Sequence, residues 1–422
     1  MEDRIGRQKA DVLVVGGGMM GICTAYYLAE QGGEVTLVEK GEVGSGCSNA
    51  NAGLLVPGHS MPLATPGIIA KGIRWMLNPE SPFYIKGRSD RDLFKWLWRF
   101  RQACRAEKML QSMEYLCQLN SASKQLYEEL AAEGVKFFFE KRGLLIVCKT
   151  RSNLEAAIQE VKDKEKLKVP AAILSREQLL EMEPALRDDV AGGVHFPQDG
   201  HIDCCQFVRV MAEQARAKGA KIMTETEVIG WEAGHGKVKK LMTTRGEMSA
   251  DQIVLAAGAW SAALGKELGL RLPIQAAKGY SLSYKRAANS PAIPMILSET
   301  KVAVTPLPGI LRLAGTLELA GVDLRINRRR VEAIIKGVPN YLKGIKAEEM
   351  ELVELWRGLR PCSPDGVPLL GRSAKYNNLM VACGHAMQGV SLGPVTGKLV
   401  SQILTGEKPM LDVAPMKVER FD

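Results

Sequence analysis

The chain has 422 residues, more than one hydrophobic core usually serves, so two domains are expected. Apolar residues make up 46% of it and charged residues 24%, which excludes a disordered or fibrous protein. The net charge of +9 is spread out, and its densest cluster, residues 325–330, has no interleaved aromatic side chains. We interpret this cluster as a solvated face, or else as contact with an anionic surface, and expect no nucleic acid.

The nine cysteines form no CxxC pair and no spacing typical of a metal site, so no metal is expected. Their odd number, with no export segment at the N-terminus, fits a reducing compartment. No stretch of about 18 uninterrupted apolar residues is present, so no membrane-spanning helix is expected. We therefore expect a cytoplasmic protein, with peripheral contact at the inner face of the plasma membrane as a further option.

Residues 11–40 carry the clearest functional signal. An apolar run at residues 12–15 predicts a buried parallel strand, a helical pattern follows, and a second apolar run at residues 35–38 stops at Glu39. Between the first strand and the helix stand three glycines with the spacing G-x-G-x-x-G, namely Gly16, Gly18 and Gly21. Because all these parts coincide in one βαβ unit, we interpret it as a dinucleotide-binding unit.

Each part of this unit has a physical role. Gly16 permits the tight turn, Gly18 lets a pyrophosphate approach the backbone, and Gly21 lets the helix pack against the strand. The phosphates then meet free N–H groups at the positive end of the helix dipole. Glu39 can accept hydrogen bonds from a ribose, and its carboxylate disfavours NADP. Lys40, the next residue, is a further cofactor-binding candidate. The unit by itself leaves FAD and NAD open.

The next stretches are a polar loop and a helical region. Residues 41–58 are rich in Gly, Ser and Asn and form either a ligand-binding loop or a plain surface loop. Residues 62–79 and 90–119 carry apolar residues at helical spacing. Within them, residues 94–105 (FKWLWRFRQACR) combine aromatic and basic side chains. This stretch packs into a helical subdomain or, as the second interpretation, rests in a membrane interface.

The second half alternates between two patterns. Residues 251–257 predict another buried strand, which ends at Gly258 before Trp260, and residues 272–326 predict successive strands of a separate sheet. A helical part is expected over residues 330–357. The α/β segments at the start, middle and end predict a discontinuous nucleotide domain and an inserted substrate domain. The expected nucleotide domain comprises residues 1–60, 190–270 and 346–422, and the expected substrate domain comprises residues 61–189 and 271–345.

Several segments together resemble the D-amino-acid oxidase/glycine oxidase superfamily of flavoproteins. They are residues 11–40, AAGAWS at 256–261, RGLRPCSPDGVPLLG at 357–371 and GHAMQGVSLGPVTGKLV at 384–400. More narrowly, residues 48–77 and PIQAAKGYSLS at 273–283 resemble the small subunit of bacterial D-amino-acid dehydrogenases. The resemblance implies an α/β fold in which a GR2-type, Rossmann-like FAD-binding domain carries an inserted antiparallel-sheet (α+β) substrate domain.

The resemblance also assigns cofactor contacts. It places the phosphates of FAD at the three glycines of the first turn and the adenosine ribose at Glu39. A polar loop, a strand end and the C-terminal turn would surround the rest of the flavin. The residues in these segments are Ser48, Asn49, Asn51, Ala52, Gly53, Gly258, Trp260, Gly384, Gln388, Gly389 and Val390.

The candidate catalytic residues are Arg360 and Tyr280. Arg360 matches the arginine that holds the substrate carboxylate in the oxidase branch, where a bidentate pair would fix the substrate's Cα–H over flavin N5. The alternative is a solvated arginine before a proline. The oxidase branch supplies tyrosines near the carboxylate, but Val302 and Ala303 stand in the aligned strand here. Tyr280 of the KGYS motif is the candidate substitute, or is simply core.

Relatives such as monomeric sarcosine oxidase attach flavin through a cysteine upstream of a TPD-like motif. The corresponding position here is Gly358, and Cys362 is out of register. The resemblance therefore implies FAD that is bound non-covalently.

The function implied is oxidative deamination of a D-amino acid, or of a cyclic relative such as D-proline or hydroxyproline. A hydride would pass from the alpha carbon to FAD N5, and the imine would hydrolyse to a 2-oxo acid and ammonia or remain cyclic. A quinone or another non-oxygen acceptor is expected to take the electrons. Two alternatives stay open: an oxygen-using oxidase of glycine or N-methyl amino acids, and a flavin-binding subunit without a substrate site of its own.

Overall fold

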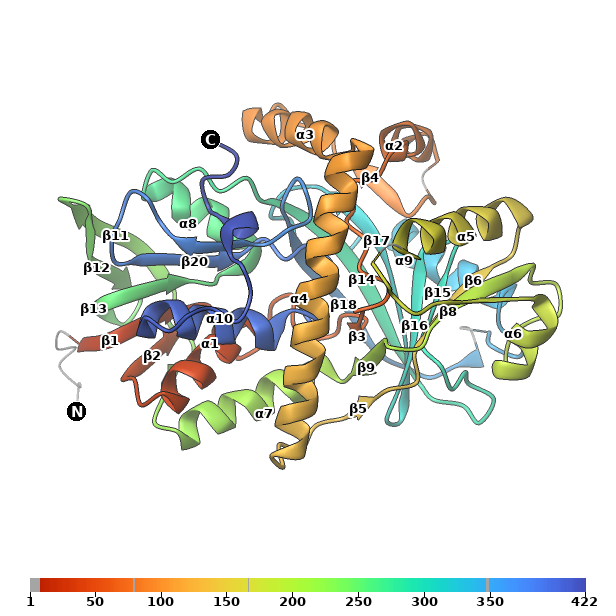
Figure 1. The fold of residues 1–422 in the computed structure, drawn as a ribbon, viewed down its shortest axis with the longest axis horizontal. Coiled ribbons are helices and arrows are strands. Elements are labelled where there is room, and N and C mark those ends of the chain that lie inside the picture. The colour runs from red at the N-terminus through yellow and green to blue at the C-terminus, as the bar shows by residue number, and fades with distance from the viewer. Residues whose placement is uncertain (1–7, 79, 166, 347–348) are drawn as a thin grey trace.

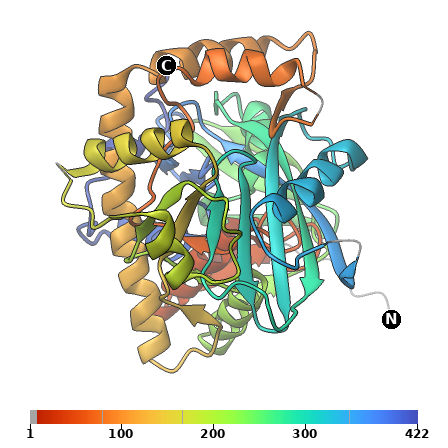
Figure 2. The same ribbon diagram turned by 90° about the vertical axis from the view of Figure 1, so that its right-hand side faces the viewer.

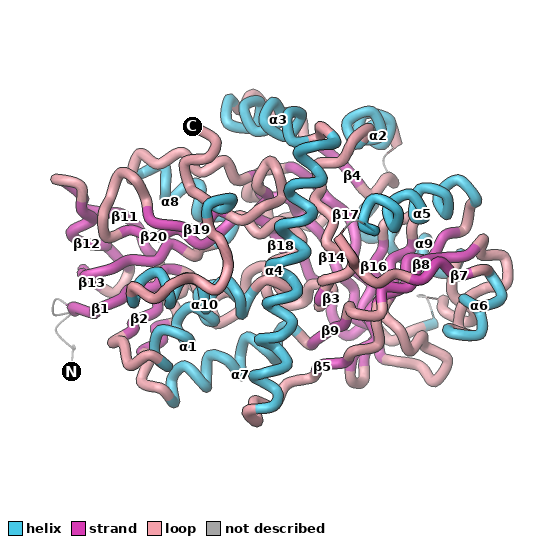
Figure 3. Tube along the Cα trace, in the orientation of Figure 1, coloured by secondary structure: helices cyan, strands magenta, loops and turns pink. Residues whose placement is uncertain are grey.

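Two large β-sheets lie side by side along the long direction of the molecule, and a long helix crosses between them (Figures 1 and 3). The computed structural model describes residues 8–78, 80–165, 167–346 and 349–422. A small third sheet joins three segments that lie well apart in the first half of the chain. Its strands are β3 (Leu54–Leu55), β9 (Gly200–Ile202) and β5 (Phe139–Glu140).

The first sheet has a parallel centre in the order β10-β2-β1-β13-β20. These strands are β10 (Lys221–Met223), β2 (Val35–Val38), β1 (Gln8–Val15), β13 (Gly246–Leu255) and β20 (Leu379–Cys383). Antiparallel strands extend it, namely β11 (Val228–Gly234), β12 (Lys237–Thr243) and β19 (Leu369–Arg372). The apolar runs at residues 12–15 and 35–38 are buried, as a parallel sheet covered on both faces requires.

Helices cover both faces of this sheet. On one face α1 (Met19–Glu30) packs against α10 (Gly393–Thr405) and α7 (Cys204–Ala217). Gly397 allows the close crossing of α10 and α1, because a Cβ there would lie 2.5 Å from the backbone carbon of Cys23. The 3-10 turn η1 (Gly258–Trp260) and α8 (Ser261–Glu267) follow β13, and α8 packs on the other face. The short turn η4 (Ala414–Met416) follows α10.

The second sheet has the order β18-β14-β17-β16-β15-β6-β8-β7 and is antiparallel except between β15 and β6. A further strand, β4 (Phe83–Ile85), pairs in parallel with β17. The expected antiparallel sheet is confirmed. Its strands are β18 (Leu352–Cys362), β14 (Gln275–Lys285), β17 (Ile310–Leu319), β16 (Val302–Leu307), β15 (Met295–Leu297), β6 (Leu144–Cys148), β8 (Gly192–Phe196) and β7 (Ala172–Leu174).

The helical expectation for residues 330–357 is correct only at its start. Helix α9 (Arg328–Gly337) and the turn η2 (Val338–Asn340) occupy the first part. Residues 352–357 were expected to be helical, but they begin strand β18, which pairs with β14 along its length. The spacing of apolar residues there suits either a helix or a strand. Pairing with the buried strand β14, which is distant in the sequence, favours the strand.

The remaining helices lie around the second sheet and between the two sheets. They are α2 (Ile68–Met76), α3 (Arg91–Ala103), α4 (Ala106–Ala132), α5 (Arg151–Glu165) and α6 (Arg176–Met182). The long helix α4 contributes Tyr127, whose hydroxyl donates a hydrogen bond to the carbonyl oxygen of Val390 at 2.6 Å.

The division into two domains stays a prediction. Within it, β8 and β18 were placed with the nucleotide domain, yet they pair in the second sheet.

Candidate active site

A cavity of about 520 Å³ opens where strands β1, β2 and β13 end. Its wall there consists of the last residues of β1 and β2 and of the turns that follow all three strands. In open parallel sheets this carboxyl edge is where ligands bind. The volume lies within the roughly 300–1,000 Å³ of small-molecule sites. The structure therefore places the expected dinucleotide unit at a cavity of suitable size.

Two of the three glycines of the first turn occupy positions that admit no side chain. Gly16 has φ +112°, and a Cβ on it would lie 2.6 Å from the carbonyl oxygen of Ala256 at the end of β13. A Cβ on Gly21 would lie 1.8 Å from the carbonyl oxygen of Gly16, so the helix packs directly on the turn. Gly18 is the N-cap of α1 and has no side chain to cap the first turn. Gly16 and Gly18 line the cavity, whereas Gly21 lies behind them.

The end of β2 forms the next part of the wall. The Glu39 carboxylate accepts hydrogen bonds from the backbone N–H of Gly17 at 2.6 Å and of Gly41 at 3.0 Å. The Lys40 ammonium lies 3.8 Å from the ring centroid of Trp260, at the end of η1. Glu39, Lys40 and Trp260 all line the cavity, as does Gly258. The carboxylate therefore stabilises the glycine turn itself as well as facing the site.

The polar loop at residues 48–53 is fixed between the two sheets. The Ser48 hydroxyl accepts a hydrogen bond from the Met19 N–H at the start of α1, at 3.0 Å. Three successive carbonyl oxygens of the loop accept hydrogen bonds from the second sheet. Ser281 donates to Ala50, Arg312 to Asn51 and Thr305 to Ala52. This loop is therefore a built part of the site and not a plain surface loop.

The loop residues differ in how they face the cavity. Ser48 and Asn51 line it, but Asn49 turns away and donates to Glu354 at 3.2 Å. Gly53 has φ +67°, and a Cβ there would lie 2.2 Å from the carbonyl oxygen of Ile202, so this position also requires glycine. Asn49, Ala52 and Gly53 thus shape the loop, and their direct contact with a cofactor stays a prediction.

The C-terminal turn before α10 closes the cavity on the α4 side. Gly389 and Val390 line it. The side-chain oxygen of Gln388 instead accepts a hydrogen bond from the side-chain nitrogen of Asn120, on α4, at 2.8 Å. Gly384 has φ +80° and begins the turn without lining the cavity. His385 also lines the cavity, and burial lowers its pKa to about 3. This histidine is therefore neutral at physiological pH.

Arg360 projects from β18 onto the wall opposite the nucleotide turn. Its Nη1 donates a hydrogen bond to the carbonyl oxygen of Thr316 at 2.8 Å. Among the described residues, no carboxylate forms an ion pair with its guanidinium. Arg360 thus lines the cavity with one hydrogen bond to the described part of the chain, at the carbonyl oxygen of Thr316, and with the rest of its donor capacity available to a ligand. This arrangement suits an arginine that binds an anionic ligand, and that role stays a prediction.

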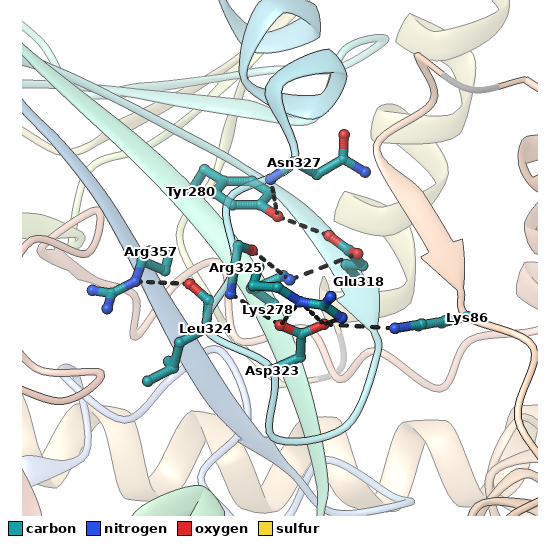
Figure 4. A network of polar contacts seen from close by, with 9 residues as sticks. All are labelled: Lys86, Lys278, Tyr280, Glu318, Asp323, Leu324, Arg325, Asn327 and Arg357. Atoms are coloured by element: carbon teal, nitrogen blue, oxygen red, sulfur yellow. Dashed lines mark hydrogen bonds and ion pairs between the residues drawn. The ribbon is translucent and has the colours of Figure 1, made fainter.

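Tyr280 lines the same cavity, but its hydroxyl is occupied (Figure 4). It donates to the carboxylate of Glu318 at 2.9 Å and accepts from the backbone N–H of Asn327 at 3.1 Å. Burial, together with the neighbouring carboxylate, raises the pKa of this phenol. In the same network Lys278 donates to the carbonyl oxygen of Arg325 at 2.8 Å. These bonds hold the segment after β17, and contact between Tyr280 and a substrate stays a prediction.

Further residues line the cavity that sequence reasoning did not select. Among them are Leu324, whose carbonyl oxygen accepts a hydrogen bond from Arg357, and Cys47 and Trp356. Burial raises the pKa of the Cys47 thiol, and nearby Arg360 partly opposes this rise. No sequence signal pointed to Trp356, because it lies opposite Ser281 in a strand that was expected to be a helix. The signal for Cys47 was its place next to Ser48.

The chain matches the family model for FAD dependent oxidoreductase (DAO) over residues 11–403. It belongs to this family. It is 30% identical to a D-amino acid dehydrogenase of Bradyrhizobium diazoefficiens, over 97% of this chain and 98% of the relative. The glycine oxidase of Geobacillus kaustophilus superposes with a TM-score of 0.79 at 25% identity, covering 98% of this chain and 99% of the other. L-proline dehydrogenase from P. horikoshii superposes at 0.76 with 21% identity, covering 99% and 98%, which shows the fold alone.

FAD is accordingly the cofactor of this oxidoreductase, and the residues present fit it. Gly16 and Gly18 line the cavity at the start of α1, and no side chain caps this end of the helix, so the backbone there is open to a pyrophosphate. Glu39 stands at the end of β2, where a ribose is bound in such units. Lys40 and Trp260 extend this wall, and Ser48, Asn51, Gly389 and Val390 line the region toward Arg360.

Acid or heat treatment of the yellow holoprotein is expected to release intact FAD. Gly358 occupies the position of the attaching cysteine, although two thiols line the cavity, the partly buried Cys47 and the buried Cys383. Burial raises the pKa of Cys383 to about 12, so its thiolate is scarce at neutral pH. Separation of the supernatant from the precipitated protein, followed by flavin absorbance of each fraction, measures the release. Flavin retained in the precipitate would contradict non-covalent binding, and Cys47→Ser would then identify the attachment site.

Proposed function

We propose that this protein is a FAD-dependent dehydrogenase that deaminates a D-amino acid, or oxidises a cyclic one of the D-proline or hydroxyproline kind. The observation that carries the proposal is Arg360, a cavity-lining arginine without a carboxylate partner among the described residues. The relatives named D-amino acid dehydrogenase, which match over nearly the whole chain, support the substrate class.

FAD, when bound, supplies the two-electron acceptor for the carbon–hydrogen bond beside the amine. Arg360 binds the substrate carboxylate through the N–H groups that Thr316 leaves free and so fixes the orientation of the alpha carbon. His385 donates to or accepts from Thr396 at 2.9 Å and is neutral, so it adds no charge to the site. The substrate amine must itself be neutral for the carbon to lose hydride, and no general base is required at this step.

The purified holoprotein is expected to convert one or more D-amino acids to the 2-oxo acid and ammonia, or a cyclic one to its imine, with a dye as electron acceptor. The L-enantiomers serve as the matched controls. Turnover of glycine or N-methyl amino acids with stoichiometric hydrogen peroxide would instead identify an oxygen-using oxidase. Absence of turnover with every amino acid, in protein that retains FAD, would favour a flavin-binding subunit without its own substrate site.

We further propose that the electrons pass to a quinone and that the protein contacts the membrane through α2 and α3. Both helices lie at the same end of the molecule, beside the start of α4 (Figures 1 and 2). Within the described residues, no helix is both long and apolar enough to cross a bilayer. Any contact that α2 and α3 make would therefore be peripheral.

The two interpretations of residues 94–105 apply to different faces of α3. Trp96 is 2% exposed, stacks on Phe100 and donates to the carbonyl oxygen of Cys362 at 2.9 Å. Trp98 and Phe94 point outward, and each is 62% exposed. Packing therefore accounts for one face, and the other is free for an interface.

Helix α2 adds to this exposed face. Its side chains, together with those of α3, form what we call the apolar end: Ile69, Ile73, Met76, Leu77, Phe94 and Trp98. Basic residues accompany them, namely Lys71, Arg74, Arg91, Lys95, Arg101 and Arg105. Exposed apolar side chains among lysines and arginines suit the interface of an anionic bilayer, where burial and charge attraction add.

The holoprotein is expected to bind vesicles that contain anionic lipid at low salt, and Ile73→Ser should weaken this binding. Ile73 and Ile229 are both 62% exposed, but Ile229 lies on β11, away from the apolar end (Figure 1). Ile229→Ser is therefore the matched control and should bind as the unchanged protein does. Vesicle flotation measures the bound fraction. Equal loss in both variants, or no binding at all, would contradict the membrane contact and leave the amino-acid chemistry untouched.

A further inference from the structure

The side chain of Arg360 spans three strands of the second sheet. Arg360 lies on β18 opposite Ala277 of β14, and its guanidinium extends over Gly279 of the same neighbouring strand. A Cβ on Gly279 would lie 2.1 Å from Nη1 of Arg360 and 2.6 Å from its Cζ. The far end reaches β17, where Thr316 accepts its hydrogen bond. The guanidinium therefore occupies the space that a side chain at position 279 would fill.

The acceptor on β17 belongs to an irregularity in the strand pairing. Lys278 pairs with Glu318, but Tyr280 pairs with Gly315, so two residues of β17 stand opposite Gly279 alone. One of them, Thr316, has φ +70°, a left-handed conformation that is strained for a β-branched residue. Such bulges redirect backbone groups and recur next to active sites. Here the carbonyl oxygen of the bulge faces Arg360.

We propose that Gly279 and the bulge at Thr316 are positioning elements that set the reach and orientation of Arg360. Gly279 supplies the space, and the carbonyl oxygen of Thr316 holds one edge of the guanidinium so that its other N–H groups face the substrate. The inference rests on the proposed function, in which Arg360 binds the substrate carboxylate. It adds that recognition of the carboxylate depends on the absence of a side chain at position 279, on the neighbouring strand β14.

Gly279→Ala tests this inference, because position 279 has no left-handed φ and the backbone itself tolerates alanine. The probe is pyruvate, a 2-oxo acid, titrated into the FAD-loaded protein while the flavin absorbance is followed. Loss of a well-placed charge-assisted contact predicts a rise of about tenfold or more in the Kd of pyruvate and in the KM of the D-amino acid. The effect on kcat should be smaller. Gly87→Ala, where a Cβ meets open space, is the matched control and should change neither constant.

A double-mutant cycle separates positioning from a general packing defect. In the Arg360→Leu background the guanidinium is gone, so Gly279→Ala should raise the Kd of pyruvate by no more than about twofold. FAD content and Tm should likewise change little when Gly279→Ala is added to Arg360→Leu. An equal loss in both backgrounds would show that Gly279 acts independently of Arg360. If Gly279→Ala alone fails to fold, the double variant must fold, and its failure would also contradict the inference.

Two further outcomes separate this inference from the function on which it rests. If Arg360→Leu weakens pyruvate binding but Gly279→Ala binds pyruvate as the unchanged protein does, the positioning role is wrong and the proposed function stands. If Arg360→Leu itself leaves pyruvate binding unchanged, the carboxylate role of Arg360 is wrong, and the proposed function loses its main support.

Discussion

Arg360→Leu is expected to lower kcat/KM for the amino-acid substrate while leaving FAD bound. The loss of a charge-assisted pair in a desolvated cavity costs on the order of 2–5 kcal/mol, or roughly 30-fold to several-thousand-fold in kcat/KM. FAD should be retained because the residues that fit its pyrophosphate and ribose lie in the turn between β1 and α1 and directly after β2, whereas Arg360 lies on β18. Steady-state kinetics with a dye acceptor and the flavin spectrum measure both effects.

Two companion variants test whether Arg360 is the residue that binds the substrate carboxylate. Arg360→Lys should recover only part of the activity, because an ammonium lacks the planar fork of the guanidinium. Among the described residues that line the cavity, the other arginine is Arg357, which donates to the carbonyl oxygen of Leu324 at 3.1 Å. Arg357→Leu should therefore cost less than Arg360→Leu. A change below about threefold in Arg360→Leu would exclude it as the anchor, and Arg357, Arg325 and Arg312 would be tested next.

Glu39→Arg is expected to weaken FAD binding strongly. The substitution removes the carboxylate that accepts hydrogen bonds from Gly17 and Gly41, and with it the expected ribose acceptor. Loss of a charged acceptor for the ribose costs about 1.5–3 kcal/mol, or roughly 10- to 100-fold in the Kd of FAD, and loss of the two backbone bonds loosens the glycine turn as well. The flavin-to-protein absorbance ratio after gel filtration measures the loss.

Glu39→Gln is the matched control for this variant. It keeps one oxygen acceptor of similar reach but removes the charge, so its FAD retention should lie between the unchanged protein and Glu39→Arg. If Glu39→Arg retains FAD fully, the ribose is held elsewhere, and the turn at Gly17 does not need the carboxylate.

The nucleotide unit was predictable because its signals are local. The strand, the glycines, the helix and Glu39 lie within residues 11–40, and contacts at the end of β13 and inside the unit require glycine at positions 16 and 21. The second sheet was also predictable as a sheet, since residues 275–285, 302–307 and 310–319 form strands as expected. In both cases the residue pattern agrees with the buried surroundings that each segment meets.

The arrangement around Arg360 depends on pairing between distant segments, and sequence patterns do not show it. Residues 352–357 carry spacing that fits a helix, but they pair with β14, which lies far away in the chain. The hydroxyl of Tyr280 is directed by Glu318 and Asn327, and neither is its neighbour in sequence. The need for glycine at 279 arises from a side chain on another strand. Such requirements exist only once the sheet has formed.

Anaerobic mixing of the holoprotein with matched D- and L-amino acids tests the central claim most directly. The flavin absorbance near 450 nm (roughly the maximum of oxidised flavins) is expected to bleach with at least one D-amino acid and not with its L-enantiomer. Arg360→Leu should bleach far more slowly at the same substrate concentration. Bleaching by the L-enantiomer alone, or equally fast bleaching in Arg360→Leu, would contradict the account.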